Sequence, residues 1–152
     1  MRVACLCSCL FFCLFQLDVR AEEKPDPRAT VEAALRHAIA LFEQRDLGKF
    51  IQDSIRSQDR EDLLQRSSAE EFTKQLSASP DFEAHRKVQI AIWKEFKTMT
   101  PTYNEDKTIA TFPAINQPGV RHSLVFEIER GLWRINVAES VATSTVPLQR
   151  KN

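Results

Sequence analysis

The 152-residue sequence predicts an α+β fold, with N-terminal helices packed on one face of a curved antiparallel sheet. In the first half of the chain, apolar residues recur at helical spacing, from Val31 to Phe42. Further along, between Val120 and Val137, apolar and polar residues alternate, as they do in strands with one buried face. Because the helical and the alternating segments are segregated along the chain, we expect a helical layer and a sheet layer around one core.

Residues 1–21 predict a signal peptide that is cleaved after Ala21. A positive residue, Arg2, precedes an apolar stretch of signal-peptide length, and a small-x-Ala pattern ends it. The four cysteines of the chain all lie in this segment, at Cys5, Cys7, Cys9 and Cys13. The mature chain would therefore contain no disulfide and no thiolate metal site. We expect a secreted or periplasmic domain that its core alone stabilises.

Charge and hydropathy limit the classes of partner. The whole chain has 21 basic and 21 acidic residues, and without the leader 19 and 20 remain, so we expect no nucleic-acid partner. After cleavage no apolar run is long enough to span a bilayer, and we expect no membrane contact. The expected organisation is a mobile lead-in over 22–29, one domain over 30–138 and a disordered tail over 139–152.

The helices are predicted from caps and apolar stripes. Asp26-Pro27 predicts the start of a helix that runs to about Gln44, and two or three short helices follow, one of them with a capping box at Ser68–Glu71. Ser79-Pro80 predicts a second long helix that ends near Met99. Its expected apolar stripe contains Phe82, His85, Val88, Ala91, Ile92, Trp93 and Phe96.

The strands are predicted from alternation and turn residues. A strand around Ile109–Thr111 either lies on a sheet edge or ends at Pro113, and a later hairpin turns at Arg130-Gly131. A two-residue turn fixes the register of this hairpin. The predicted pairs are Glu129–Leu132, Ile128–Trp133, Glu127–Arg134, Phe126–Ile135 and Leu124–Val137, and the same register puts His122 opposite Glu139. Trp133 should face the core, and Glu127 with Arg134 should form a solvated ion pair on the other face.

Several of these features resemble a known family. A first amphipathic helix is followed by a break at Arg45-Asp46-Leu47, with Phe50 and Ile51 after it, and a strand carries the pattern Gly-x-Trp-x-Ile at residues 131–135. Together they resemble the NTF2-like, or cystatin-like, α+β cone fold, over residues 30–137. The resemblance implies a sheet curled around the helices, often with a pocket open at one end. Some members are isomerases, cyclases or dehydratases, and many others are non-catalytic binding or dimerising modules.

The candidate site residues are those that such a pocket could use. We expect His122, His85, Trp93 and Tyr103 to contact a ligand. His122 and Glu139 are weak candidates for a general base and the carboxylate that orients it, and the alternative is a histidine at the frayed end of a sheet. The histidines are scattered without metal-ligand spacing, and we expect neither a metal nor a cofactor.

Three hypotheses of function follow. The first is an exported, non-catalytic NTF2-like domain that binds a small apolar molecule or a protein partner. The second is a structural module that forms a homodimer through its open sheet face, where Val125 and Leu132 add apolar area beside Arg121 and Arg134. The third is a small isomerase or cyclase-type enzyme that uses His122 and Glu139.

Overall fold

The computed structural model describes residues 26–65, 67–140 and 142–144. The expected signal peptide, the start of the lead-in and the end of the tail lie outside the described residues. The described residues form five helices, α1 (Val31–Glu43), α2 (Leu47–Ser54), α3 (Ser57–Leu64), α4 (Ala69–Ser77) and α5 (Phe82–Phe96). They also form seven strands, β1 (Thr102–Tyr103), β2 (Ile109–Thr111), β3 (Ile115–Gln117), β4 (Val120–His122), β5 (Val125–Glu129), β6 (Leu132–Ile135) and β7 (Ala142–Ser144).

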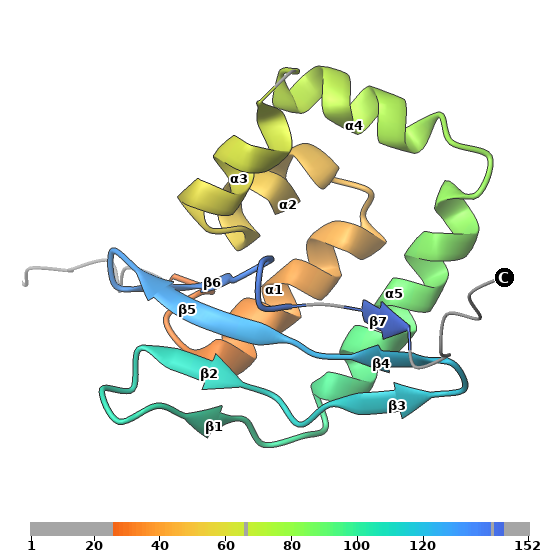
Figure 1. The fold of residues 1–152 in the computed structure, drawn as a ribbon. Coiled ribbons are helices and arrows are strands. Elements are labelled where there is room, and N and C mark those ends of the chain that lie inside the picture. Colours follow the sequence, from red (N-terminus) through yellow and green to blue (C-terminus); the bar gives the residue numbers. More distant parts are fainter. Residues whose placement is uncertain (1–25, 66, 141, 145–152) are drawn as a thin grey trace, which may run out of the picture.

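The α+β class is confirmed, with the helices stacked on one side of antiparallel strands (Figure 1). A four-stranded sheet has the order β1-β2-β5-β6, and a three-stranded sheet has the order β3-β4-β7. The two sheets meet where β4 continues into β5. At this point the backbone N–H of Phe112 donates to the carbonyl of Leu124 at 3.0 Å and links the strand pairs on either side. At the other edge, Ile55 forms a parallel bridge with Ile135 of β6.

Helix α1 begins later than the Asp26-Pro27 pattern predicts. Thr30 is the cap, and its hydroxyl accepts from the backbone N–H of Ala33 at 3.2 Å. The Asp26 carboxylate accepts from the backbone and side chain of Arg28 instead, and so closes a separate turn. The carbonyl of Arg28 then accepts from Trp133 N–H at 3.0 Å. The last four residues of the expected mobile lead-in are therefore tied to β6.

The short helices agree with the prediction, and the stripe of the long helix needs correction. Ser68 and Glu71 form the expected capping box of α4. Helix α5 begins at Phe82, after the Ser79-Pro80 turn, and its buried residues are Phe82, Ile90, Ile92, Trp93 and Phe96. His85, Val88 and Ala91 are exposed, Val88 at 55%. The apolar residues of this helix cover more than one face, and only one face can be buried against the rest of the protein. These three residues lie outside that buried face.

The hairpin register is confirmed over four pairs, from Glu129–Leu132 to Phe126–Ile135. Arg130 and Gly131 both have positive φ, 54° and 80°, as a tight two-residue turn requires. Trp133 is 8% exposed on the inner face, where the prediction placed it.

The register extends as far as Asn136, whose N–H donates to the carbonyl of Val125 at 2.9 Å, but the predicted Leu124–Val137 pair does not form. The N–H of Val137 donates to the Asp59 carboxylate at 2.8 Å, and Ser140 N–H bonds to the carbonyl of Asn136 at 2.9 Å. These bonds turn the chain away before it could pair further with β5. Strand β4 pairs with β7 instead, so His122 lies opposite Ala142 and not opposite Glu139. Residues 142–144 of the predicted tail thus belong to a sheet.

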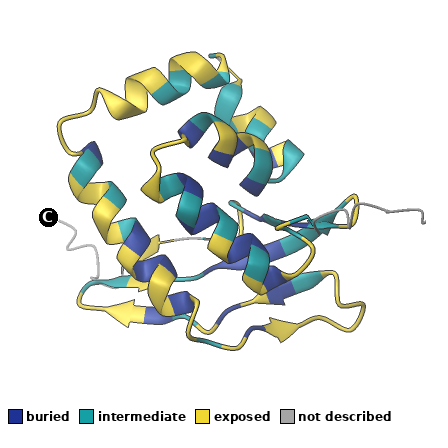
Figure 2. Cartoon of the chain, turned by 180° about the vertical axis from the view of Figure 1, so that it is seen from behind, coloured by how far each residue is buried: buried dark blue, intermediate teal, exposed yellow. Residues whose placement is uncertain are grey.

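The core lies between α1, α5 and the sheets. Buried residues gather where these helices meet the strands, whereas every residue of α4 is half-buried or exposed (Figure 2). The most deeply buried large side chains include Leu35 of α1, Phe96 of α5 and Phe126 of β5. The Phe96 and Phe126 rings both contact Phe112, at centroid distances of 5.8 and 6.1 Å. This arrangement leaves the short helices α2 to α4 to close one end of the core.

The Gly131→Ala substitution should lower the free energy of unfolding by about 1 kcal/mol, because a Cβ is strained at a φ of 80° even with open space around it. Gly48→Ala in α2 is the matched control. Its Cβ also meets open space, and it should raise stability by up to about 1 kcal/mol. Urea titrations of the two variants would measure the difference, and equal effects would contradict the turn geometry.

Candidate functional site

A cleft of about 310 Å³ lies among α1, α2, α5 and the β4–β7 end of the sheets. Its floor is aromatic. The ring of Phe42 lies 4.7 Å from that of Phe50 and 4.9 Å from that of Trp93, and the Phe50 and Trp93 rings stack at 5.5 Å. Aromatic rings in such contacts form a rigid apolar surface. The cleft therefore presents a preformed apolar floor.

Four polar side chains line the same cleft, and two of them are engaged within the protein. The hydroxyl of Ser140 accepts from Val125 N–H at 2.9 Å and donates to the Val125 carbonyl. The hydroxyl of Ser123 donates to the carbonyl of Glu139 at 3.3 Å. The side chains of Gln89 and His122 make no hydrogen bond within the described part of the chain. These two groups are available to a ligand.

The structure brings together two of the four predicted ligand-contacting residues. Trp93 and His122 line the cleft. His85 is exposed on α5, and Tyr103 is 46% exposed on β1, where its ring contacts Trp133. Neither of them reaches the cleft. Glu139 is exposed, so the geometry does not assemble the proposed pair of His122 with Glu139.

The cleft residues that sequence reasoning missed include Phe42, Phe50 and Gln89. The phenylalanines lie on either side of the Asp46 break, at the end of α1 and within α2. A sharp turn between two helices brings the residues on either side of it close together. The position of two aromatic residues around such a turn could therefore have predicted that Phe42 and Phe50 share a site. Gln89 carries no such signal, because a glutamine on a long helix is usually solvated.

A second hollow of about 700 Å³ lies between α2, α3 and α4. It is the larger of the two, but one wall is the exposed helix α4, and its lining includes the charged side chains of Arg60, Glu70 and Lys74. A hollow under a weakly packed helix is a poor binding site, because binding would have to order its own wall. The aromatic cleft is therefore the better candidate.

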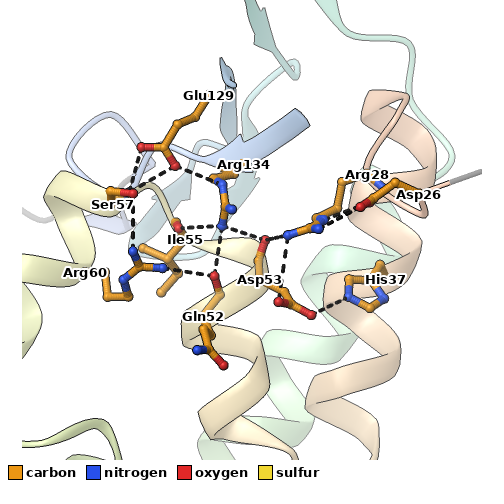
Figure 3. Close-up of polar contacts among 10 residues, drawn as sticks. All are labelled: Asp26, Arg28, His37, Gln52, Asp53, Ile55, Ser57, Arg60, Glu129 and Arg134. Atoms are coloured by element: carbon orange, nitrogen blue, oxygen red, sulfur yellow. Dashed lines mark hydrogen bonds and ion pairs between the residues drawn. The ribbon is translucent and has the colours of Figure 1, made fainter. Parts of the chain in front are cut away.

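Three arginines hold the carboxyl end of α2, which forms part of the cleft wall (Figure 3). Arg134 Nη1 donates to the carbonyls of Gln52 and Asp53 at 2.9 and 3.0 Å, and Arg60 also donates to Gln52. Arg28 donates to Asp53 at 3.3 Å. We call Arg28, Arg60 and Arg134 the arginine clasp. Cations are favourable at a helix carboxyl end, so the clasp stabilises α2 where it meets β6.

Carboxylates surround the clasp and balance its charge. Arg134 Nε lies 2.9 Å from Glu129 Oε2, an ion pair whose geometry is not that of a hydrogen bond. Arg28 forms a two-pronged pair with Asp26, and these hydrogen bonds lower the pKa of Asp26 from 3.8 to about 2. His37 Nε2 lies 3.4 Å from the Asp53 carboxylate. Burial lowers the pKa of Arg134 despite these partners.

The predicted solvated ion pair of Glu127 with Arg134 is corrected. The two residues are opposite in register, but Arg134 turns toward α2, and Glu127 accepts from Arg56 and from the Asn136 amide. Arg56 also donates to Asp59, which is 6% exposed, at 2.9 and 3.0 Å. The charged side chains on the outer face of the hairpin are therefore half-buried, because they bond to residues at the start of α3 and to one another. Close contact with the start of α3 makes this possible.

The outer face is also less open than the homodimer hypothesis requires. Val125, one of its two expected apolar contacts, is 7% exposed because the loop that carries Ser140 covers it. Leu132 is half-buried, and Arg134 is held by α2. Only Arg121 of the expected set is exposed among the described residues.

Comparisons of the chain with protein-family models, with curated proteins and with solved structures find no match. Within the part of the chain that the structure describes, no helix has the length and apolar character needed to cross a bilayer. In the same residues, no cluster of three or more His, Cys, Asp or Glu side chains is arranged to hold a metal ion.

Replacement of Arg134 by Met should lower the free energy of unfolding by about 2 kcal/mol, because the carbonyls at the end of α2 lose a charged donor and Glu129 loses its ion-pair partner. Arg121→Met, at an exposed site on β4, is the matched control and should change stability by less than about 0.5 kcal/mol. Chemical denaturation measures both, and equal losses would show that the clasp is dispensable.

Acid should destabilise the protein through its paired carboxylates. Hydrogen bonds from Arg28 and Arg56 lower the pKa of Asp26 and Asp59, respectively. Burial acts to raise the pKa of Glu129, but its hydrogen bonds with Ser57 outweigh this effect, so that the pKa is lowered. A lowered pKa in the folded state means stabilisation that is complete above the ordinary pKa and is lost as pH falls. Stability should thus decline from about pH 4.5 toward about pH 2.

This pH dependence is measured by urea titrations across that range. Asp26→Asn removes one of the paired carboxylates, so its stability should fall less steeply between about pH 4 and pH 2 than that of the unmodified protein. Stability that stays constant or rises as the pH falls would contradict the assignment.

Proposed function

We propose that this protein binds a small, mostly apolar molecule in the cleft over Phe42, Phe50 and Trp93. The observation that carries the proposal is the contact of these three aromatic rings beneath an open cleft. Ligand sites in proteins are concave and mostly apolar, with few polar groups, and their volumes start near 300 Å³. The volume of this cleft, about 310 Å³, is at the lower end of that range.

The size of the cleft limits the ligand. One water occupies about 30 Å³ of liquid, so the cleft has room for roughly ten waters and hence for a molecule of about ten non-hydrogen atoms. A ligand of this size that gains about 0.4 kcal/mol per atom would bind with a Kd near 1 mM. We therefore propose a fragment-sized ligand with modest affinity.

We propose binding and not catalysis, because the cleft lining supplies no carboxylate to His122 within the described residues. A histidine that acts as a general base is usually oriented by a second group, and the best candidate, Glu139, lies on the surface. We also propose that the domain is an exported member of the NTF2-like family. The predicted leader and the packing of the helices on one side of antiparallel sheets support this assignment.

Ala142→Phe should abolish the binding of ethylbenzene, a probe of suitable size, because the new ring would fill the cleft from β7. Thr143→Phe is the matched control. Neighbouring residues of a strand point to opposite faces, so this ring would project away from the cleft and leave binding unchanged.

Binding is measured from the shift of the Trp93 indole N–H signal in nitrogen-edited NMR titrations. Thermal unfolding would verify that both variants fold, as phenylalanine suits an exposed strand position. Failure of ethylbenzene to bind the unmodified protein would refute the proposed function.

A further inference from the structure

We infer that the cleft selects uncharged amphiphiles, whose apolar body lies on the aromatic floor and whose hydroxyl, carbonyl or amide group meets His122 and Gln89. This inference rests on the proposed function and adds the chemical class of the ligand. Three observations carry it: the charge of the lining, the state of its polar groups, and the positions from which they come.

The first observation is that the described part of the lining has no acidic side chain and neither of the strongly basic residue types. Among the described residues that line the cleft there is no Lys, Arg, Asp or Glu. A charged head group that entered it would lose water without gaining a countercharge, and burial of an unpaired charge is costly. Helix α5 carries one arginine, Arg86. Its side chain already donates to the carbonyl of Phe42 and to Glu83. A carboxylate or an ammonium group should therefore be rejected.

The second observation is that the lining still offers hydrogen bonds. The hydroxyls of Ser123 and Ser140 bond to the backbone, whereas the side chains of His122 and Gln89 have no hydrogen-bond partner among the described residues. A glutamine amide both donates and accepts, and a neutral imidazole does the same through its two nitrogens. These two groups can satisfy either a ligand hydroxyl or a ligand carbonyl.

The third observation is that these two groups come from different walls. His122 is on β4 and Gln89 is on α5, and both are half-buried. The aromatic floor lies with α1, α2 and the Trp93 turn of α5. A ligand polar group that found neither partner would leave a hydrogen bond unmade, which weakens binding. The walls thus favour a polar group while the floor favours an apolar body.

The experiment uses four probes that share one aromatic body. Ethylbenzene is apolar, 2-phenylethanol carries a hydroxyl, and phenylacetate and 2-phenylethylammonium are charged at about pH 7.5. We expect 2-phenylethanol to bind the full chain at least about tenfold more tightly than either charged probe, as read from the Trp93 indole N–H signal.

Variants then test the two polar partners. His122→Leu and Gln89→Leu should each lower the ratio of the 2-phenylethanol affinity to the ethylbenzene affinity by about fivefold. The matched controls are His85→Leu and Gln75→Leu, which change the same residue types at exposed positions outside the cleft. Their ratios should equal that of the unmodified protein. Because the readout is a ratio, a small loss of stability in one variant does not imitate the effect.

The outcomes separate this inference from the proposed function. If ethylbenzene binds but a charged probe binds as tightly as 2-phenylethanol, the selectivity is overturned and the apolar site remains. An unchanged ratio in both His122→Leu and Gln89→Leu would likewise overturn the roles of these residues. If ethylbenzene does not bind, the proposed function fails and this inference fails with it.

Discussion

The carboxyl ends of α1 and α2 depend on arginines that other elements supply. The last turns of both helices carry only acidic or uncharged residues, so their terminal carbonyls have no cation of their own. Arg86 of α5 donates to the carbonyls of Phe42 and Glu43 at the end of α1, and Arg134 of β6 donates to those at the end of α2. Each arginine comes from an element that packs beside the helix. The bond that satisfies the helix end therefore also fixes its position.

This constraint explains where the cleft lies and why it is uncharged. Phe42 stands at the end of α1, and Phe50 and Ile55 lie near the end of α2, so the two anchored helix ends bring the aromatic floor together. The charged residues of the clasp and of the network of Arg56 with Glu127 are paired with one another and do not line the cleft. Segregation of this kind leaves an interior surface that has no charge to satisfy, which suits neutral ligands.

Features that depend on neighbouring residues in the sequence could be predicted, whereas features that depend on contacts between distant residues could not. The hairpin register and the inward Trp133 were predictable, because a period of two and a two-residue turn leave one arrangement that buries the apolar residues. The path after Asn136 was not predictable, since it depends on the bond from Val137 N–H to Asp59, which is far away in sequence. The candidate site was half predictable for the same reason: Trp93 and His122 lie on strongly patterned elements, but only the tertiary packing shows that His85 and Tyr103 face elsewhere.

The bridge between Ile55 and Ile135 has a further consequence, for self-association. Strand β6 ends the four-stranded sheet, and an uncovered edge strand is a template on which another chain can add a strand. The bridge, with the bond from Arg56 N–H to the Ile135 carbonyl, occupies part of this edge. The opposite edge, β1, is two residues long and follows Pro101. Both borders of this sheet are therefore poor templates for the addition of a strand from another chain.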